Sequence, residues 1–347
     1  MMKGIRINQP GEAEIFEIAI PVRRAGEALL RVLYGGICGS DLGTYRGTFA
    51  YASYPRIPGH EFSAQIVEID PADAAKHNLH TGQIITCNPY FNCGSCYSCT
   101  RGFVNCCEHN ETMGAQRDGA FTEYITMPVE RIYDGKGLSP LQLTLIEPFC
   151  ISYHGVSHAN VQPGEKVLVI GAGTIGVLAA AAAKAAGGEV YIADIAPQKL
   201  DHAVEIMGLA GRILNDAPAH FTEQVEKITN GNGFDVTIEA VGLPATFLSC
   251  VDAAAFGGRV VQVGVGKRNA DFNFTLLQKK ELKLYGSRNA LKKDFLALID
   301  LVKSGKIDIT KIVTNTYELA DGPQAFKDFS EHADTMLKVV IHFADPE

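Results

Sequence analysis

The spacing of hydrophobic and polar residues changes near Pro163, and this change divides the chain into two regions. Before Pro163, short apolar runs alternate with glycine- and proline-rich turns, which predicts short strands such as residues 67–69 and 120–127. After it, continuous apolar runs alternate with longer stretches of helical character, which predicts alternating strands and helices. We therefore expect a mostly β region followed by an α/β region.

The second region begins with the apolar run at residues 166–170, Lys-Val-Leu-Val-Ile, which is typical of a strand buried on both faces. An alanine-rich helix ending at Ala186 follows. The pattern then predicts strands at 189–193, 234–239 and 259–264, and helices at 198–207, 221–229 and 245–255. This alternation predicts a doubly wound parallel sheet with helices on both faces. After about residue 291 we expect a helix, a loop, a helix and a final strand at 338–343.

A glycine-rich loop joins the first of these strands to its helix. Its sequence, Gly171-Ala-Gly173-Thr-Ile-Gly176, has the spacing of a dinucleotide-binding turn, and Asp194 ends the next strand. Phosphates would meet the helix N-terminus, where unpaired N–H groups favour negative charge. Asp194 would accept hydrogen bonds from the ribose hydroxyls and repel a 2′-phosphate, which favours NAD over NADP. The residues predicted to contact NAD are Gly171, Gly173, Thr174, Ile175, Gly176, Asp194 and Lys199. For Lys199, a solvated position on a helix is an equally good interpretation.

Composition narrows the classes of function. With 347 residues, 46% of them hydrophobic, the chain is long enough for two domains with separate cores. A net charge of −8 disfavours general attraction to nucleic acid or to an anionic membrane. The N-terminus lacks a signal-peptide apolar run, and the most apolar window, residues 177–186, is too short to span a bilayer. Nine cysteines, four of them clustered, favour a reducing cytoplasm with thiolates bound to metal.

The clustered cysteines are Cys93, Cys96, Cys99 and one of the adjacent pair Cys106 and Cys107. Their spacing can present four thiolates to one ion, with Gly94 and Gly102 letting the backbone wrap around it. A closed set of sulfur ligands favours a structural zinc. An iron–sulfur cluster fits less well, because the ferredoxin-type run has its fourth cysteine sooner and a proline after it.

A second set of metal-capable side chains lies at two glycine turns, Cys38-Gly-Ser-Asp41 and Gly59-His60-Glu61. Sulfur, nitrogen and oxygen ligands together are typical of a catalytic zinc that keeps one position open for water or substrate. Each motif alone is weak, since single buried cysteines and hydrogen-bonded core histidines are common. Their occurrence beside a cysteine cluster and ahead of a dinucleotide loop strengthens the metal interpretation.

Taken together, these motifs resemble those of the zinc-dependent medium-chain alcohol dehydrogenases over essentially the whole chain. The matching segments are Cys38-Gly-Ser-Asp41, Pro58-Gly-His-Glu61, the cysteine cluster, Asp118-Gly-Ala-Phe-Thr-Glu-Tyr124, Glu147-Pro148 and the glycine loop with Asp194. The resemblance implies that residues 1–154, completed by 291–347, form a mostly β, GroES-like catalytic domain with a structural zinc lobe at 88–110. It also implies that residues 155–290 form an NAD-binding Rossmann domain, and that a cleft separates the two.

The resemblance further implies two zinc ions per chain. The ligands of the catalytic zinc would be Cys38, His60 and Glu61, and the family spacing selects Cys107 as the fourth structural ligand after Cys93, Cys96 and Cys99. In the polyol and threonine dehydrogenase branches a further glutamate lies at the position of Glu147, as a ligand or a water-mediated neighbour. A carboxylate at a helix N-terminus before Pro148 is an equally good interpretation of Glu147.

Zinc in such a site would lower the pKa of a substrate hydroxyl, and hydride would then pass to C4 of the nicotinamide. Ser40 matches the family hydroxyl that carries the alcohol proton away, and Asp41 matches a carboxylate that orients the zinc-ligand histidine.

Two positions depart from the family. Gly43 replaces the histidine that completes the proton relay in many relatives, so either water or the cofactor ribose would take its place or the proton-transfer step would be slower. Ala64 replaces a glycine, a small change that should still pack.

The segments 146–149 and 286–289 most resemble bacterial dehydrogenases of hexonates, such as galactonate 5-dehydrogenase. The expected substrate is therefore a small-molecule secondary alcohol of a polyol, sugar or sugar acid. The alternatives are L-threonine 3-dehydrogenase and a catalytically impaired regulatory protein that binds NAD and zinc. Residues proposed near the substrate, with packing or a surface ion pair as the alternative, are Tyr45, Arg46, Phe49, Tyr54 and Arg288. The family also implies a homo-oligomer, dimer or tetramer, with no nucleic-acid or membrane partner.

Overall fold

The computed structural model describes residues 1–347, and the chain forms two compact units. Unit 1 contains residues 1–147 and 291–347, and unit 2 contains residues 148–290. The first boundary expected from the sequence, after residue 154, lies inside helix α5 (Ile146–Ala159), whereas the division between the units lies near the start of that helix.

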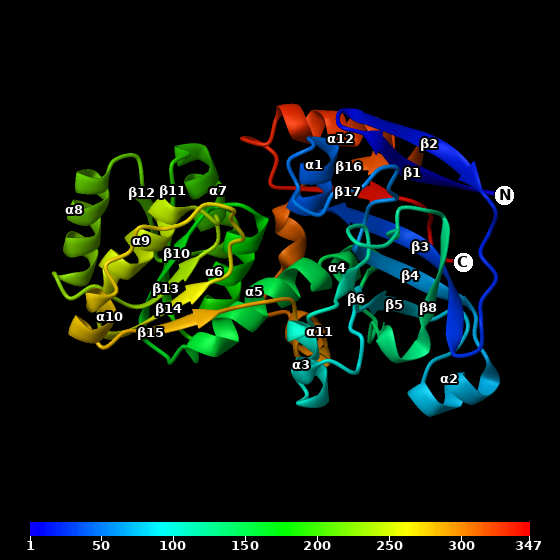
Figure 1. Ribbon diagram of the computed structural model, residues 1–347, viewed down its shortest axis with the longest axis horizontal. Helices are drawn as coiled ribbons and strands as arrows, with labels where there is room; N and C mark the ends of the chain where they lie inside the picture. The colour runs from blue at the N-terminus through cyan, green and yellow to red at the C-terminus, as the bar shows by residue number, and fades with distance from the viewer. The chain divides into compact units, whose positions relative to one another are not determined.

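Unit 2 is built on a six-stranded parallel sheet with the strand order β12-β11-β10-β13-β14-β15. The predicted doubly wound sheet is therefore confirmed, and its order reverses beside β10, where such sheets bind ligands at the carboxyl ends of the strands. Figure 1 shows α8 and α9 on one side of these strands and α6 and α7 on the other. The strands are β10 (Lys166–Ile170), β11 (Glu189–Asp194), β12 (Gly211–Leu214), β13 (Phe234–Glu239), β14 (Ala254–Gln262) and β15 (Lys283–Gly286). The helices that follow α5 are α6 (Thr174–Ala185), α7 (Pro197–Met207), α8 (Pro218–Thr229), α9 (Pro244–Ala253) and α10 (Thr275–Lys279).

Unit 1 is built on a seven-stranded sheet in which both ends of the chain take part. Its strand order is β16-β17-β3-β4-β5-β9, and β8 also pairs with β3. The C-terminal strand β17 is antiparallel to β3, with Val340 opposite Gly36, and β3 is antiparallel to β4, with Gly36 opposite Glu61. In Figure 1 the red and orange C-terminal strands accordingly lie beside the blue N-terminal ones. The strands of this sheet are β3 (Glu27–Ile37), β4 (Glu61–Glu68), β5 (Ile84–Cys87), β8 (Tyr124–Pro128), β9 (Ile132–Asp134), β16 (Val313–Glu318) and β17 (Lys338–His342).

The other elements of unit 1 surround this sheet. Two small antiparallel sheets have two strands each: β1 (Met2–Gln9) with β2 (Glu12–Ile18), and β6 (Tyr90–Phe91) with β7 (Glu111–Thr112). The α-helices are α1 (Gly39–Tyr45), α2 (Pro71–His77), α3 (Tyr97–Thr100), α4 (Pro140–Thr144), α11 (Lys292–Lys303) and α12 (Gly322–Glu331). Short 3₁₀ helices are η1 (Val104–Cys106), η2 (Val129–Arg131), η3 (Ile309–Ile312) and η4 (Leu319–Asp321).

Several sequence-based boundaries need correction. The strand expected at 67–69 is the end of β4, which begins at Glu61, and the strand expected at 120–127 begins at Tyr124. Ala120 and Phe121 instead donate backbone hydrogen bonds to the carbonyls of Gly59 and Pro58, which tie the following strand to the His60 turn. The loop expected between the last two helices contains strand β16. Its alternating half-buried and exposed residues carry too little apolar signal to be recognised.

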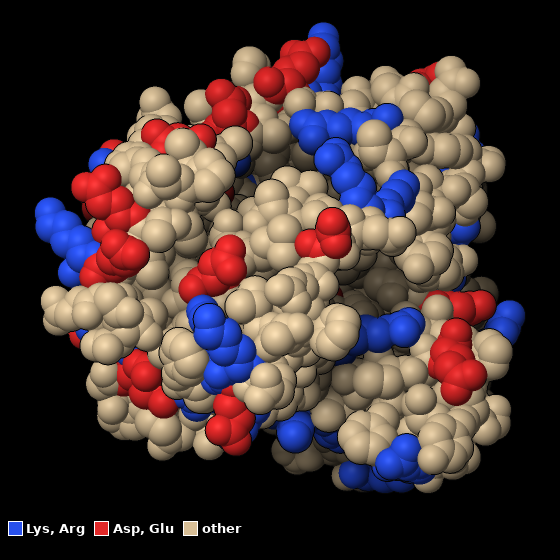
Figure 2. Space-filling view, turned by 60° about the vertical axis from the view of Figure 1, so that its left-hand side comes forward, with Lys and Arg blue, Asp and Glu red and all other residues tan.

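Charged residues are distributed over the surface. The face drawn in Figure 2 carries both acidic and basic side chains, and most of it belongs to other residues. No helix is both long and apolar enough to cross a bilayer.

Candidate functional site

Cys38, His60 and Glu61 come together in unit 1 because β3 and β4 are neighbours in its sheet. Cys38 follows the end of β3 and begins α1, while His60 and Glu61 stand at the start of β4. Their ligand atoms, one sulfur, one nitrogen and one oxygen, lie within 4.8 Å of one another. His60 and Glu61 are buried, and Cys38 is half-buried. The structure thus brings the three predicted catalytic ligands into one group.

Asp41 lies beneath this group and is almost fully buried. Its carboxylate accepts hydrogen bonds from the backbone N–H groups of Cys38, at 3.0 Å, and Gly59, at 3.1 Å. It also lies 3.8 Å from Nδ1 of His60, a buried nitrogen with no hydrogen-bond partner. Asp41 therefore ties together the two turns that carry the ligands and faces the imidazole ring, as expected for a residue that orients a metal-binding histidine.

Burial and neighbouring charge shift the pKa values in this group in opposite ways. Burial lowers the pKa of His60, but the negative charges of Asp41 and Cys38 outweigh it and hold the pKa well above its usual value. For Asp41, burial raises the pKa and His60 opposes the change. The buried imidazole therefore lies at a position surrounded by side chains that can carry negative charge and can serve as metal ligands. A divalent cation fits such a position.

The carboxylate of Glu61 has a partner that the sequence pattern did not reveal, Lys338 at the start of β17. The Lys338 ammonium group donates to Oε2 of Glu61 and, at 3.0 Å, to the carbonyl of Ile37. Both charged side chains are buried. Lys338 reaches Glu61 across β3 at Gly36, where an added Cβ would lie 2.3 Å from the Glu61 carboxylate and 3.0 Å from Cε of Lys338. A larger residue at this position would therefore displace the two charged side chains from the positions they hold in this ion pair. A lysine that opens an otherwise apolar strand was the one available sequence signal.

Glu147, the second residue of α5, lies outside the three-residue group. Its Oε1 accepts a hydrogen bond from the hydroxyl of Tyr90, and both residues are buried. Burial raises the pKa of Glu147 to about 7, an effect that His60 opposes and Glu61 reinforces. The shared electrostatic influence indicates that Glu147 is near the ligand group without converging on the same point.

The predicted proton carrier and substrate neighbours lie around α1. Ser40 is half-buried in the first turn of α1, and its carbonyl accepts a hydrogen bond from Thr44. Tyr45 packs against Phe326, the Tyr54 hydroxyl donates to the carbonyl of Thr44, and Arg46 donates to the hydroxyl and carbonyl of Ser330. The tyrosines and Arg46 thus each have a contact within unit 1, and their proposed place near the substrate stays a prediction. The other two residues proposed near the substrate are Phe49 and Arg288. Phe49 contacts the ring of Tyr51 edge-on, and Arg288 is exposed after β15.

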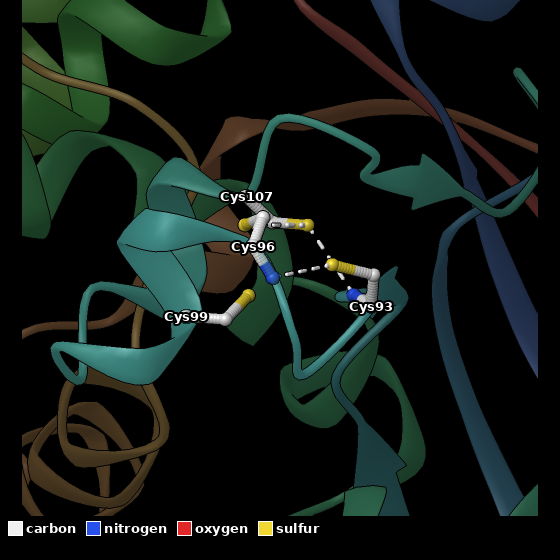
Figure 3. A group of neighbouring side chains, drawn as sticks. All are labelled: Cys93, Cys96, Cys99 and Cys107. Atoms are coloured by element: carbon white, nitrogen blue, oxygen red, sulfur yellow. Dashed lines mark hydrogen bonds between the residues drawn. The ribbon is translucent and has the colours of Figure 1, made fainter.

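The four predicted structural ligands form a separate group between β6 and β7. The ligand atoms of Cys93, Cys96, Cys99 and Cys107 lie within 4.8 Å of one another, and Figure 3 shows their sulfur atoms around a common space. The structure brings Cys107 into the group and leaves Cys106 exposed outside it. The Cys96 and Cys107 sulfurs are 3.9 Å apart, close to the separation of about 3.8 Å that a tetrahedron with zinc–sulfur bonds of about 2.3 Å requires.

Backbone amides prepare these sulfurs for negative charge. The N–H of Cys96 donates to the Cys93 sulfur and the N–H of Cys93 to the Cys107 sulfur, each at 3.3 Å. Hydrogen bonds from the backbone of Ser95 and Cys96 lower the pKa of Cys93 to about 6, whereas burial raises the pKa of Cys99 to about 11. Four sulfur atoms within 4.8 Å of one another, two of which accept hydrogen bonds from backbone amides, fit a structural zinc.

The glycine loop of unit 2 has the geometry expected from its sequence. It joins β10 to α6, and Gly171 adopts a φ of +112°. A Cβ on Gly176 would lie 1.8 Å from the Gly171 carbonyl, so only glycine permits this close helix–strand approach. A Cβ on Gly173 would meet no atom within 4 Å, which leaves open space where a pyrophosphate would approach.

Asp194 stands at the end of β11, as predicted, and its carboxylate already contacts the loop. It accepts hydrogen bonds from the N–H groups of Ala172, at 2.7 Å, and Ala196, at 3.0 Å. Thr174 and Ile175 begin α6, and Lys199 is half-buried on α7. These residues fit a dinucleotide whose ribose reaches Asp194.

Two family models match the chain in sequence. The alcohol dehydrogenase GroES-like domain matches residues 24–136, and the zinc-binding dehydrogenase model matches residues 174–304. L-Galactonate-5-dehydrogenase of Escherichia coli is 36% identical over 96% of this chain and 97% of its own length. L-Threonine 3-dehydrogenase of Pyrococcus horikoshii is 32% identical over 91% of this chain and 92% of its own. A solved dehydrogenase from E. coli CFT073, complexed with NADH, superposes with a TM-score of 0.90 at 29% identity and covers 99% of both chains.

Proposed function

The chain belongs to the zinc-dependent medium-chain alcohol dehydrogenase family, and on that premise we propose that it oxidises a secondary alcohol to a ketone with zinc and NAD. The substrate class is a polyol, a sugar or a sugar acid. The observation that carries the proposal is the convergence of Cys38, His60 and Glu61 in a chain that also has a complete dinucleotide loop. Unit 1 would be the catalytic domain and unit 2 the cofactor domain.

The residues of unit 1 would hold and orient a catalytic zinc. Cys38, His60 and Glu61 supply its ligands, and Asp41 fixes the imidazole of His60. A zinc ion held by these residues would supply Lewis acidity that lowers the pKa of a substrate hydroxyl, and bound NAD would supply the hydride acceptor. Ser40 takes the hydroxyl proton, and because Gly43 offers no side chain, the proton continues through water or the cofactor ribose. Cys93, Cys96, Cys99 and Cys107 would hold the second, structural zinc.

The residues of unit 2 would select and bind NAD. The glycine loop and the N-terminus of α6 receive the pyrophosphate, and Lys199 contacts the adenosine ribose. Asp194 accepts hydrogen bonds from the ribose hydroxyls while it continues to hold the loop through Ala172. Its negative charge disfavours a 2′-phosphate, so NAD is preferred to NADP.

Sequence similarity to two dehydrogenases supports the proposed substrate class and the order in which we rank the candidate substrates. L-Galactonate-5-dehydrogenase, whose name denotes a sugar acid, supports the hexonate assignment, and L-threonine 3-dehydrogenase supports threonine as the second candidate. We also propose a cytoplasmic homo-oligomer. Strand β15 leaves a free edge on the unit 2 sheet, where Leu284 is exposed, and Phe256 and Phe274 are exposed on the segments before it.

The test combines metal analysis with a panel of polyols, aldonates and L-threonine, in which NADH absorbance reports turnover. We expect two zinc ions per chain and activity on a polyol or aldonate. Cys38→Ser should reduce zinc to one ion and lower kcat/KM by about a thousandfold or more, because several kcal/mol of charge stabilisation are lost. Cys106→Ser, which changes a cysteine outside both groups, is the matched control.

Two outcomes would contradict the proposal. Turnover of L-threonine alone would reverse the order of the two substrates. A wild-type protein with both zinc ions and bound NAD but no turnover on any substrate would favour the regulatory alternative.

A further inference from the structure

The segment from Asn88 to Asn92 connects the catalytic sheet of unit 1 with the cysteine group. It leaves β5 at Cys87, forms β6 and ends one residue before Cys93. Near its middle, the Tyr90 hydroxyl donates to Glu147 beside the catalytic group. Whatever fixes this segment therefore fixes the position of the Glu147 carboxylate as well.

One side chain, Arg131 at the end of η2, contacts three successive residues of this segment. Its guanidinium donates to the Tyr90 carbonyl and, at 2.9 Å, to Oδ1 of Asn92, and it lies 4.6 Å from the centre of the Phe91 ring. The backbone carbonyl of Arg131 also accepts from the N–H of Asn88, at 2.9 Å. Hydrogen bonds from a half-buried guanidinium in a fixed planar geometry restrain both position and orientation.

Asn92 extends the connection into the cysteine group. While its Oδ1 accepts from Arg131, its Nδ2 donates to the sulfur of Cys99 at 3.8 Å. A continuous series of contacts thus runs from Cys99 through Asn92, Arg131 and Tyr90 to Glu147. A thiolate held by metal presents Asn92 with a charged acceptor in a fixed place, and that acceptor moves when the metal is absent.

We propose that Arg131 is a positioning residue that couples metal occupancy of the cysteine group to the placement of Tyr90 and Glu147 at the catalytic zinc site. This inference rests on the two metal sites of the proposed function. Metal in the cysteine group strengthens zinc binding at Cys38, His60 and Glu61, and by linkage the reverse also holds. The cysteine group is then more than a local support for the loop that contains it.

The test is a cycle of variants with zinc affinity at the catalytic site as the readout. Affinity is measured by competition with a chromophoric chelator, without substrate or NAD. Cys99→Ser should weaken catalytic-site affinity by about tenfold in the otherwise natural protein, and by less than about twofold when Arg131→Met is also present. Asn92→Ala, which leaves all four thiolates in place, should abolish the coupling in the same way. Arg117→Met is the matched control, because Arg117 lies 3.8 Å from the centre of the same Phe91 ring and pairs with Glu111 instead.

A second measurement decides the matter if Cys99→Ser fails to fold. In Cys38→Ser protein, zinc added to the cysteine group should slow amide hydrogen exchange at the start of α5 by about tenfold, and Arg131→Met should remove this slowing. The coupling would be overturned if Cys99→Ser lowered catalytic-site zinc affinity equally with and without Arg131, or if added zinc left amide exchange in α5 unchanged. Either result would leave the dehydrogenase proposal intact. Preserved coupling in a protein without turnover would contradict only the dehydrogenase proposal.

Discussion

The two candidate metal sites of unit 1 are built in opposite ways. The cysteine group comes from one short stretch of chain, lies partly exposed, and takes its polar partners from backbone amides and short side chains of that same stretch. The catalytic group takes Cys38 and His60 from the turns at the ends of two neighbouring strands, and Glu61 pairs with Lys338, 277 residues away, as its counter-charge. The cysteine site is thus formed by residues close in sequence and is partly exposed to solvent. The catalytic site joins residues far apart in sequence and is buried.

This difference determines what each site depends on. In the cysteine group no buried ion pair has to be satisfied, and Cys93 is exposed to water, so the bound metal would supply most of the order. In the catalytic group the ionisable side chains are removed from water, and each must find a partner within the fold. Those buried side chains are Asp41, His60, Glu61, Glu147 and Lys338. Loss of one charge there should affect the folding of unit 1 itself, whereas loss of a cysteine should leave the global stability of the fold largely unchanged.

The largest expected effect comes from removing the buried counter-charge. Lys338→Met leaves the Glu61 carboxylate buried without its partner and should lower the free energy of unfolding by about 3–5 kcal/mol. Lys136→Met, which breaks a more exposed pair with Asp300, should cost about 1 kcal/mol or less. Urea unfolding followed by circular dichroism measures both changes.

Adding Glu61→Gln to Lys338→Met should recover part of the loss, because a neutral amide needs no counter-charge. Similar losses from Lys338→Met and Lys136→Met would show that the buried pair is not distinctive, and the contrast between the two sites would then disappear.

A smaller and local effect is expected in the cysteine group. Cys107→Ser should reduce zinc to one ion per chain and accelerate amide exchange around the group by roughly a hundredfold, or about 2.7 kcal/mol of local opening free energy. Exchange in the parallel sheet of unit 2 should be unchanged. Cys106→Ser, one residue away and outside the group, should leave both zinc ions bound. Metal analysis with hydrogen-exchange mass spectrometry tests this, and zinc loss from Cys106→Ser instead would reassign the fourth ligand.

The same contrast explains what sequence alone predicts. The glycine loop, Asp194 and the spacing of the four cysteines are local patterns, and the structure arranges each of them as the spacing indicates. The roles of Lys338 and Tyr90 were not predicted. The partner of Lys338 depends on the order of strands β17, β3 and β4, and the partner of Tyr90 depends on the path of the segment after β5. No sequence pattern encodes that order directly.

Three edge strands were not predicted from the sequence, for a different reason. β12, β15 and β16 each lie at an edge of a sheet, and their residues are largely half-buried or exposed. Without a buried face they lack the continuous or alternating apolar pattern that marks a strand. The central strand β10, buried between two neighbours, matches its predicted bounds of residues 166–170.

The smallest expected effect comes from a variant of Asp41, which orients the ring of His60 in the catalytic group but is not itself a predicted zinc ligand. Asp41→Asn keeps one acceptor oxygen but places an NH₂ group against a backbone N–H of Cys38 or Gly59 and removes the charge facing His60. Zinc affinity at this site should fall about 10- to 100-fold, as for other residues that orient metal-binding histidines. Asp118→Asn is the matched control, since Asp118 accepts from the N–H of Ile57 at 3.3 Å and pairs with Arg56. Chelator competition should show a loss for Asp41→Asn alone. Equal losses for both variants would mean that holding the turn before His60 matters more than orienting its ring.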